Sequence, residues 1–338
     1  MLQTTVNVPD TSLHITFIDV GQGDSTLIRL PVRTDQVKRA ILIDCPVGKS
    51  PAVLNLLEYH QIQHLELVIV THSDEDHCGG IPDVLVNFAR IGTIGQVAYI
   101  PDSPNRTNQP GVNQVYRRFA RQILDLEHSG ELAWWKPNLD TRCIDNVIIK
   151  FLHPNERDSW LGLVEQDRNS VSQVVSVEYG SFRTLFAADI TKKGWQAILD
   201  RYEAGDNIAQ TKYNYLRSQI VKVPHHGGAW KDYPSMVEMF SLLQPEYIVI
   251  SAGTNNRYGH PSRSIFDAVA DLRTLKRVLC TEATQHCCGL VQNEIYPCAS
   301  SVEFVISDNS VVVQPDIDSH VARIIKLLHP ACSKWLRL

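Results

Sequence analysis

A cluster of histidines and carboxylates follows one strongly apolar segment of the chain, in the sequence THSDEDHCGG at residues 71–80. His72, Asp74, Asp76 and His77 are four candidate metal ligands within six residues. The preceding LELVIVT is a short, continuous apolar run of the kind that forms a buried strand. A tight turn after a strand directs alternate side chains toward one point, and histidine with carboxylates suits a pair of divalent cations. We therefore expect a metal site here.

Three further polar positions also follow apolar runs that are typical of strands. Asp189 ends LFAAD, the pair His225 and His226 follows IVKVP, and His260 follows YIVISAG in the sequence YGHP. Sites form where such strand ends converge, because loops there are carried by a rigid scaffold. These residues and the 71–80 segment are therefore expected to share one site.

The elements that must position these side chains alternate between strands and helices. LHITFIDVGQGDSTLIRL alternates apolar and polar residues on both sides of a Gly-x-Gly break, but a strand follows where a dinucleotide site requires a helix. Ser50 is expected to cap the helix SPAVLNLLEYHQ. Each half of the chain supplies several strands and then helices, which favours two sheets with outer helices.

The domain organisation is expected to be one catalytic domain over residues 1–315 with a C-terminal amphipathic helix over residues 316–338. Residues 101–145 are interpreted as an insertion, made of a Pro/Asn-rich loop and an amphipathic helix. Three arginines lie opposite the apolar face of that helix, and a solvated face is favoured over a phosphate track. They are Arg117, Arg118 and Arg121.

Composition excludes several classes of protein. With 43% hydrophobic and 20% charged residues, the chain is not expected to be disordered or fibrous. A formal net charge of -5 argues against holding nucleic acid by bulk electrostatics, although a local basic track stays compatible. Without a signal peptide or a long apolar stretch, the expectation is a cytoplasmic protein without membrane contact.

Four of the eight cysteines are crowded into residues 280–298. Together with His286 they are candidates for a structural zinc ion, although their spacing matches no standard pattern. Buried, unpaired thiols are the equal alternative. The four are Cys280, Cys287, Cys288 and Cys298.

Taken together, these motifs resemble the metallo-β-lactamase superfamily. DVGQGDS, HSDEDHCGG, RNSVSQVV, FAADI, VPHHGG and SAGTNNRYGHPS are similar, in order and spacing, to the nuclease-like domain of ComEC-type DNA-uptake proteins. The resemblance spans roughly residues 13–305 and implies a four-layer αββα sandwich. The fold class expected is therefore α/β (α+β).

The resemblance also implies roles for individual residues. The residues at ligand positions are His72, Asp74, Asp76, His77, Asp189, and His225 or His226. We favour His225 slightly within that pair. Asp44 is expected to orient the ligands, and His260 to act on the substrate as a proton donor or oxyanion partner. The implied catalytic group is Asp76, Asp189 and His260.

Two departures from the superfamily pattern bear on the metal. Asp74 replaces a histidine, as in the ComEC-like branch, and Asn169 with Ser170 replaces the mid-chain ligand histidine. More oxygen and less imidazole shifts the preference from zinc toward manganese or magnesium, although the affinity order favours zinc. Two divalent ions are expected, zinc or manganese, with magnesium as a third option.

The expected function is phosphodiester hydrolysis by a metal-activated water, with nucleic acid as substrate. A cyclic or small nucleotide is the second substrate class considered. Hydrolysis of a lactam, lactone or thioester is an alternative because the same nucleophile attacks acyl carbons. A scaffold or sensor subunit that binds protein partners in a larger defence complex is the non-enzymatic alternative.

Overall fold

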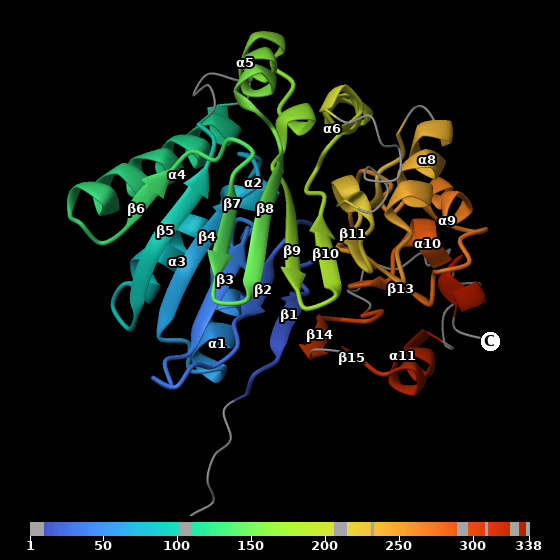
Figure 1. The fold of residues 1–338 in the computed structure, drawn as a ribbon, viewed down its shortest axis with the longest axis horizontal. Helices are drawn as coiled ribbons and strands as arrows, with labels where there is room; N and C mark the ends of the chain where they lie inside the picture. Colours follow the sequence, from blue (N-terminus) through green and yellow to red (C-terminus); the bar gives the residue numbers. More distant parts are fainter. Residues whose placement is uncertain are drawn as a thin grey trace, which may run out of the picture.

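Two β-sheets packed face to face form the centre of the molecule, and helices cover their outer faces (Figure 1). The computed structural model describes residues 10–101, 110–205, 215–230, 233–288, 297–307, 310–324 and 331–335. No helix among these residues is long and apolar enough to span a bilayer.

The first sheet has eight strands within the described residues. In spatial order they are β15 (Ser310–Gln314), β14 (Val302–Ser307), β1 (Leu13–Phe17), β2 (Thr26–Arg29), β3 (Arg39–Ile43), β4 (His64–Val70), β5 (Thr93–Tyr99) and β6 (Ala133–Trp135). Strands β3 to β6 are parallel, so their carboxyl ends lie at one edge of the sheet.

The second sheet has seven strands in the part of the chain that the structure describes. In spatial order they are β13 (Arg277–Cys280), β12 (Tyr247–Ile250), β11 (Ile220–Lys222), β10 (Phe182–Phe186), β9 (Val174–Tyr179), β8 (Val147–His153) and β7 (Thr141–Ile144). Strands β10 to β13 are parallel, and their carboxyl ends likewise share one edge.

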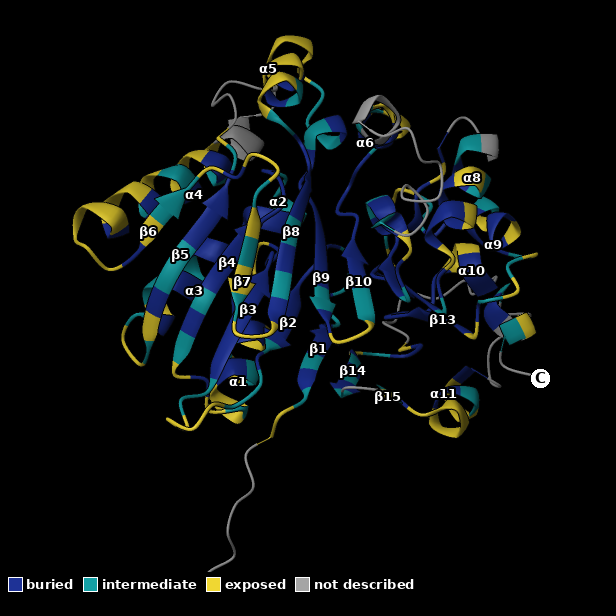
Figure 2. Cartoon of the chain, viewed as in Figure 1, coloured by how far each residue is buried: buried dark blue, intermediate teal, exposed yellow. Residues whose placement is uncertain are grey.

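Helices form the two outer layers. Those that pack on the first sheet are α1 (Ser50–Tyr59), α3 (Ile81–Phe88) and α4 (Pro110–His128). Those that pack on the second sheet are α6 (Lys192–Gly205), α8 (Tyr233–Leu243), α9 (Arg263–Ala268), α10 (Gln285–Cys288) and α11 (Ile317–Ile324). The remaining helical segments are α2 (Glu75–Cys78), α5 (Glu156–Glu165), η1 (Asn169–Val171), η2 (Pro224–Gly227) and η3 (Ala331–Trp335). Figure 2 shows the strands mostly buried and the outer faces of α4 and α5 exposed.

Both faces of each sheet carry buried apolar side chains, as the residues of a single strand show. In β3, Ile41 and Ile43 face the second sheet, whereas Ala40 and Leu42 face the helices. Side chains of a strand alternate between its two faces, so a strand covered on both sides reads as a continuous apolar run. Across the sheet interface the rings of Phe17 and Phe186 lie 5.7 Å apart. The expected αββα sandwich is confirmed.

The structure bears on three local expectations. The helix α1 includes Ser50 as its first residue and has Lys49 at the N-cap, so Ser50 is not the cap. The segment interpreted as an insertion contributes edge strands to both sheets, β6 and β7, while residues 102–109 lie outside the described residues. Of the C-terminal segment, α11 and η3 are described, and residues 325–330 and 336–338 are not.

Candidate metal centre

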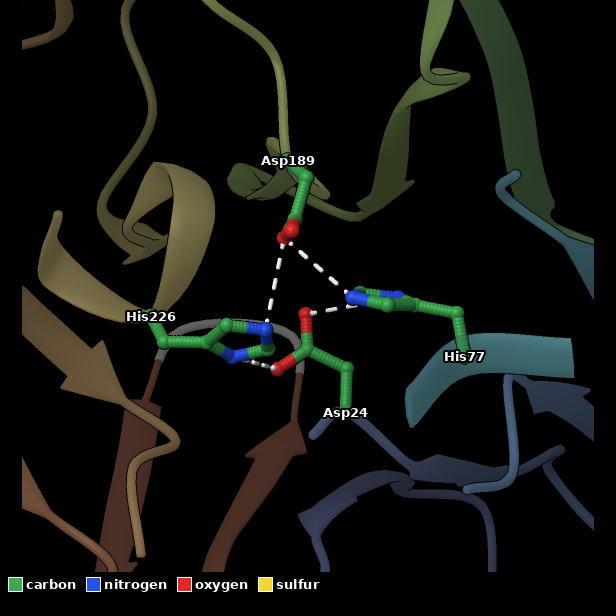
Figure 3. A group of neighbouring side chains, drawn as sticks. All are labelled: Asp24, His77, Asp189 and His226. Atoms are coloured by element: carbon green, nitrogen blue, oxygen red, sulfur yellow. Dashed lines mark ion pairs between the residues drawn. The ribbon is translucent and has the colours of Figure 1, made fainter. Parts of the chain in front are cut away.

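Four buried side chains meet at the shared edge of the two sheets. Asp24 lies between β1 and β2, His77 in α2 after β4, Asp189 after β10, and His226 in η2 after β11. Their ligand atoms all lie within 4.8 Å of one another (Figure 3). The site therefore draws on both sheets.

Asp189 lies at the centre, and its two carboxylate oxygens face different histidines. Oδ1 is 3.2 Å from Nε2 of His77 and 3.6 Å from Nε2 of His226. Oδ2 is 3.9 Å from Nε2 of His72 and 3.7 Å from Nε2 of His225. This arrangement defines two half-sites, one on each oxygen of a single carboxylate.

Hydrogen bonds behind the two innermost histidines determine which ring nitrogen faces Asp189. His77 donates from Nδ1 to Oδ2 of Asp44 at 2.8 Å, and His226 donates from Nδ1 to the Ser251 carbonyl at 3.0 Å. Thr71 in turn holds Asp44 through its backbone N–H and its hydroxyl, at 2.8 and 2.6 Å. Both rings therefore present an unprotonated Nε2 in their neutral form, which is the atom a metal binds.

Polar atoms on the side facing Asp189 have no hydrogen-bond partner. Nε2 of His72, His77 and His226 and Oδ1 of Asp189 are all buried and unsatisfied. A buried polar atom without a partner costs roughly 1–3 kcal/mol, and four at one point are not expected without something to bind. Imidazole nitrogens with a carboxylate fit divalent zinc or manganese, so the residues present fit the expected metals.

Opposite charges dominate the electrostatics of this centre. Burial favours the neutral acid at Asp189, but His226 and His77 outweigh burial and hold the pKa of this carboxyl well below its usual range. Burial likewise opposes protonation of His226, yet Asp189 and Asp24 raise its pKa to about 9. The carboxylates therefore attract positive charge into the centre, whether protons or metal ions.

Asp74 and Asp76 lie at the rim and are less buried than the central group. Oδ2 of Asp76 is 3.4 Å from Nε2 of His226, and Oδ2 of Asp74 is 3.7 Å from Nε2 of His72. The other oxygen of Asp74 forms an ion pair with Arg168. Each rim carboxylate thus belongs to a different half-site.

The backbone explains how two adjacent histidines reach two half-sites. His225 and His226 both have left-handed backbone conformations, with φ of 50° and 51°, and Gly227 continues the turn at φ 81°. The turn is tied to the second sheet, because the His225 N–H donates to the Ala188 carbonyl at 2.8 Å. Successive left-handed residues direct the two rings differently: His226 is buried, and the side chain of His225 is 37% exposed.

His260 lies beside this turn, outside the group around Asp189. Its ring centroid is 5.2 Å from that of His225 and 6.3 Å from that of His226. Burial, with the nearby His225 and His226, lowers its pKa to about 4. A β-carbon at Gly228 would lie 2.7 Å from Cε1 of His260, so glycine is required for the ring to approach.

Two residues of the centre were not found from the sequence. Asp24 lies on the Nδ1 side of both rings, 3.2 Å from His226 and 4.0 Å from His77, and forms an ion pair with the buried Lys222. The signals were present: Asp24 lies within DVGQGDS, and Lys222 is a lone charge in the apolar strand IVKVP. A buried lysine needs a partner, which makes such a residue informative.

Asn169 and the cysteines are placed elsewhere. Asn169 lies in η1, and its described contacts do not include the side chains around Asp189. The four cysteines are all buried, and the candidate metal cluster found among the described residues does not include them. A structural zinc ion on these thiols stays a prediction. Cys287 and Cys288 donate to the Thr284 carbonyl at 3.4 and 3.0 Å, within the core under the second sheet.

The chain is similar in sequence to a known family and to two competence proteins. The model of the metallo-beta-lactamase superfamily matches residues 18–251 of the 338. Competence protein ComA of Neisseria gonorrhoeae is 27% identical over 263 residues, and ComE operon protein 3 of Bacillus subtilis is 24% identical over 277 residues. These alignments cover 78% and 75% of this chain. The chain spans about three tenths of the length of these relatives, 30% in each case.

Solved structures show a weaker likeness. YhfI, a metallo-beta-lactamase fold protein from Bacillus subtilis, has a TM-score of 0.45 and 8% sequence identity. The likeness covers 79% of this chain and 95% of YhfI.

Proposed function

The chain belongs to the metallo-beta-lactamase superfamily, and from this premise we propose that it is a metal-dependent phosphodiesterase that hydrolyses nucleic acid. The observation that carries the proposal is the pair of half-sites on Asp189, whose buried imidazole nitrogens have no partner. A carboxylate with ligands on both of its oxygens suits two ions that act on one phosphate.

The chain's own residues divide the work between the two half-sites. His77, His226 and Asp76 would hold one ion on Oδ1 of Asp189. A second group would hold the other ion on Oδ2; it consists of His72, His225 and Asp74. In this assignment His225 takes the place of the mid-chain histidine that the chain lacks.

Bound ions would supply an activated water and neutralise charge on the attacked phosphate. Behind them, Asp44 and Asp24 hold the Nδ1 sides of His77 and His226, which fixes the orientation of both rings. His260 borders the half-site of His225, and with its pKa lowered to about 4 it is a neutral ring, placed to donate an N–H hydrogen bond to a phosphate or leaving oxygen.

Nucleic acid is favoured as substrate by the similarity to competence proteins and by the ComEC-type motifs. The test is a substrate panel on purified protein loaded with zinc, manganese or magnesium. The panel compares single-stranded DNA, duplex DNA, RNA, cyclic nucleotides and a generic lactam. We expect cleavage of nucleic acid by the wild type and none by Asp189→Ala.

Each alternative has its own outcome in that panel. Turnover of cyclic nucleotides alone would identify a small-nucleotide phosphodiesterase. Opening of the lactam alone would identify an acyl hydrolase. Failure to bind any metal or turn over any substrate would favour a scaffold or sensor subunit.

A further inference from the structure

A groove leads away from the metal centre along the start of helix α6. Its volume is about 1000 Å³, and His225 lies at its inner end. Thr191, Lys192, Lys193 and Trp230 also line it. Because Nε2 of His225 is 3.7 Å from Oδ2 of Asp189, the groove borders the metal centre.

Two polar groups of the groove are buried and lack a hydrogen-bond partner. Trp230 is only 8% exposed, and its indole Nε1 has no acceptor. The hydroxyl of Thr191 has no partner either. An indole N–H can only donate, so the partner that Trp230 Nε1 lacks is an acceptor, which a ligand would supply.

The first turn of α6 adds positive potential. The helix spans 14 residues, and Thr191 immediately precedes its first turn. The N–H groups of a first helical turn carry a partial positive charge and bind anions. Lys192 and Lys193 are exposed on this turn, and Lys193 is ion-paired with Glu165 of α5.

Two carboxylates also line the groove, but both are engaged in local hydrogen bonds. Asp167 accepts from the Ser170 backbone N–H at 3.1 Å, and Asp200 accepts from the Gln196 side chain at 2.7 Å. These hydrogen bonds come from neutral donors and leave both carboxylates charged, so the two lysines of the groove only offset them. The groups that favour an anion are the donors of Trp230 and Thr191 and the first turn of α6.

We propose that this groove binds a second phosphate of the substrate strand, next to the phosphate that is cleaved. The inference rests on the proposed function and deepens it, because it makes a polynucleotide the substrate and a single isolated phosphodiester a poor one. Trp230 Nε1 and the Thr191 hydroxyl donate to the phosphate oxygens, and the lysines offset the charge of the two carboxylates.

The test compares substrates with one phosphate and with many. The variants are Lys192→Gln with Lys193→Gln, and Trp230→Phe, which keeps a ring but removes the N–H. For an oligonucleotide we expect each variant to raise KM, the lysine pair about tenfold. The lysine pair should also reduce the log–log salt slope by about 0.7, the value for one phosphate of a single strand that is no longer neutralised.

Hydrolysis of bis(p-nitrophenyl) phosphate, which has one phosphate, should not change in these variants. Equal losses on both substrates, or none on the oligonucleotide, would overturn the inference.

Lys276→Gln is the matched control, because this exposed lysine precedes β13 at the sheet edge opposite the metal centre. It should leave KM unchanged for both substrates. Melting temperatures of all variants should stay close to wild type, which separates a binding defect from misfolding.

Failure of the proposed function is distinguishable from failure of the groove. If wild-type protein hydrolyses neither substrate, the proposed function is wrong, and fluorescence anisotropy with a phosphorothioate oligonucleotide then tests the groove alone. Weaker binding by the lysine variant than by Lys276→Gln would support the groove. Equal binding by the two would contradict it.

Discussion

Asp189 is the residue on which the centre depends. Both of its oxygens contact histidines, and it is almost fully buried. No other described carboxylate contacts histidines of both half-sites. Its removal leaves buried imidazoles without the main group that balances their charge.

We expect Asp189→Ala to abolish both metal occupancy and turnover. Elemental analysis after gel filtration should show loss of both ions, because the shared carboxylate serves both half-sites. Asp125→Ala on the exposed face of α4 is the control and should retain them. Full metal content in Asp189→Ala would contradict the two half-sites.

His260→Ala should separate catalysis from metal binding. The ring lies beside His225 rather than against Asp189, so metal content should stay at the wild-type level. The rate should fall about a hundredfold or more, the usual scale for losing one hydrogen-bond donor to an oxyanion. Loss of metal in this variant would show that His260 is a ligand.

At the scale of elements, tight turns bring strand ends together. Gly23 is an example, with φ of 121° and a backbone packed against the 71–80 segment. A β-carbon there would lie 2.5 Å from the Asp76 carbonyl oxygen and 2.6 Å from Pro46. The Asp24 N–H donates to that same carbonyl at 3.1 Å, so this turn sets the position of both Asp24 and Asp76.

Two glycine variants separate the free-energy cost of this close approach from the cost of the positive φ. Gly48 has φ of 72°, but no atom lies within 4 Å of the place that a β-carbon would take, so Gly48→Ala should cost only about 1–2 kcal/mol of backbone strain. Gly23→Ala adds a clash with backbone and should cost about 3 kcal/mol or more, with loss of metal. Urea unfolding would measure the loss of stability in both variants, and elemental analysis would measure their metal content. Equal losses of unfolding free energy would show that the atoms around Gly23 move aside for a β-carbon.

Strand β14 is joined to β1 and β2 by a charged cluster that responds to pH. His14 and Arg29 bond to Glu303, and their hydrogen bonds lower the pKa of this carboxyl from 4.5 to about 2. A lowered folded-state pKa adds stability above the unfolded value, and that stability is lost as pH falls through the folded value.

Glu303→Gln should therefore be less stable than wild type at pH 7. The difference in free energy of unfolding should shrink as pH falls from about 4.5 toward 2, where Glu303 becomes neutral. Urea unfolding across this range would measure it. If the stability difference between wild type and Glu303→Gln grew as the pH fell, the assigned direction of the Glu303 pKa shift would be wrong.

At the scale of the whole molecule, the metal centre connects the two sheets. His72 and His77 follow β4 of the first sheet, whereas Asp189 and His226 follow strands of the second. Gln173 makes a similar connection, since its side chain donates to the Val70 carbonyl at 2.6 Å and its N–H to the Thr71 carbonyl. Ligands bound at this edge should therefore stabilise the whole sandwich.

Chelation should lower the melting temperature. Metal at a hundred times its Kd adds about 2.7 kcal/mol of stability, which for a chain of 338 residues corresponds to roughly 4 °C. Differential scanning fluorimetry with and without a chelator would measure the shift. Asp189→Ala, which should bind no metal, serves as the control and should show no shift.

The sequence alone was sufficient for the layers and for the position of most candidate site residues. Apolar runs are readable as buried strands because each strand contacts neighbours on both faces, and polar residues after such runs mark strand ends. His72, His77, Asp189 and the histidine pair could be placed at one sheet edge on that basis. In β3 and β12, successive side chains face the other sheet and the outer helices in turn, as the two-residue period of a strand requires.

Tertiary structure alone decided how those side chains divide around Asp189. Two left-handed residues direct His225 and His226 to different half-sites, and nothing in their adjacency reveals which ring is buried. Asp24 and Lys222 each carry a signal in the sequence, but only the packing of strands distant in sequence places Asp24 behind the rings and Lys222 against it. The four crowded cysteines are buried in the core, where Cys287 and Cys288 donate to the Thr284 carbonyl and Cys298 lies 3.3 Å from His320, a neighbour that spacing along the chain did not indicate. Spacing along the chain determines which element carries a side chain, whereas the distance between two side chains depends on the packing of both elements.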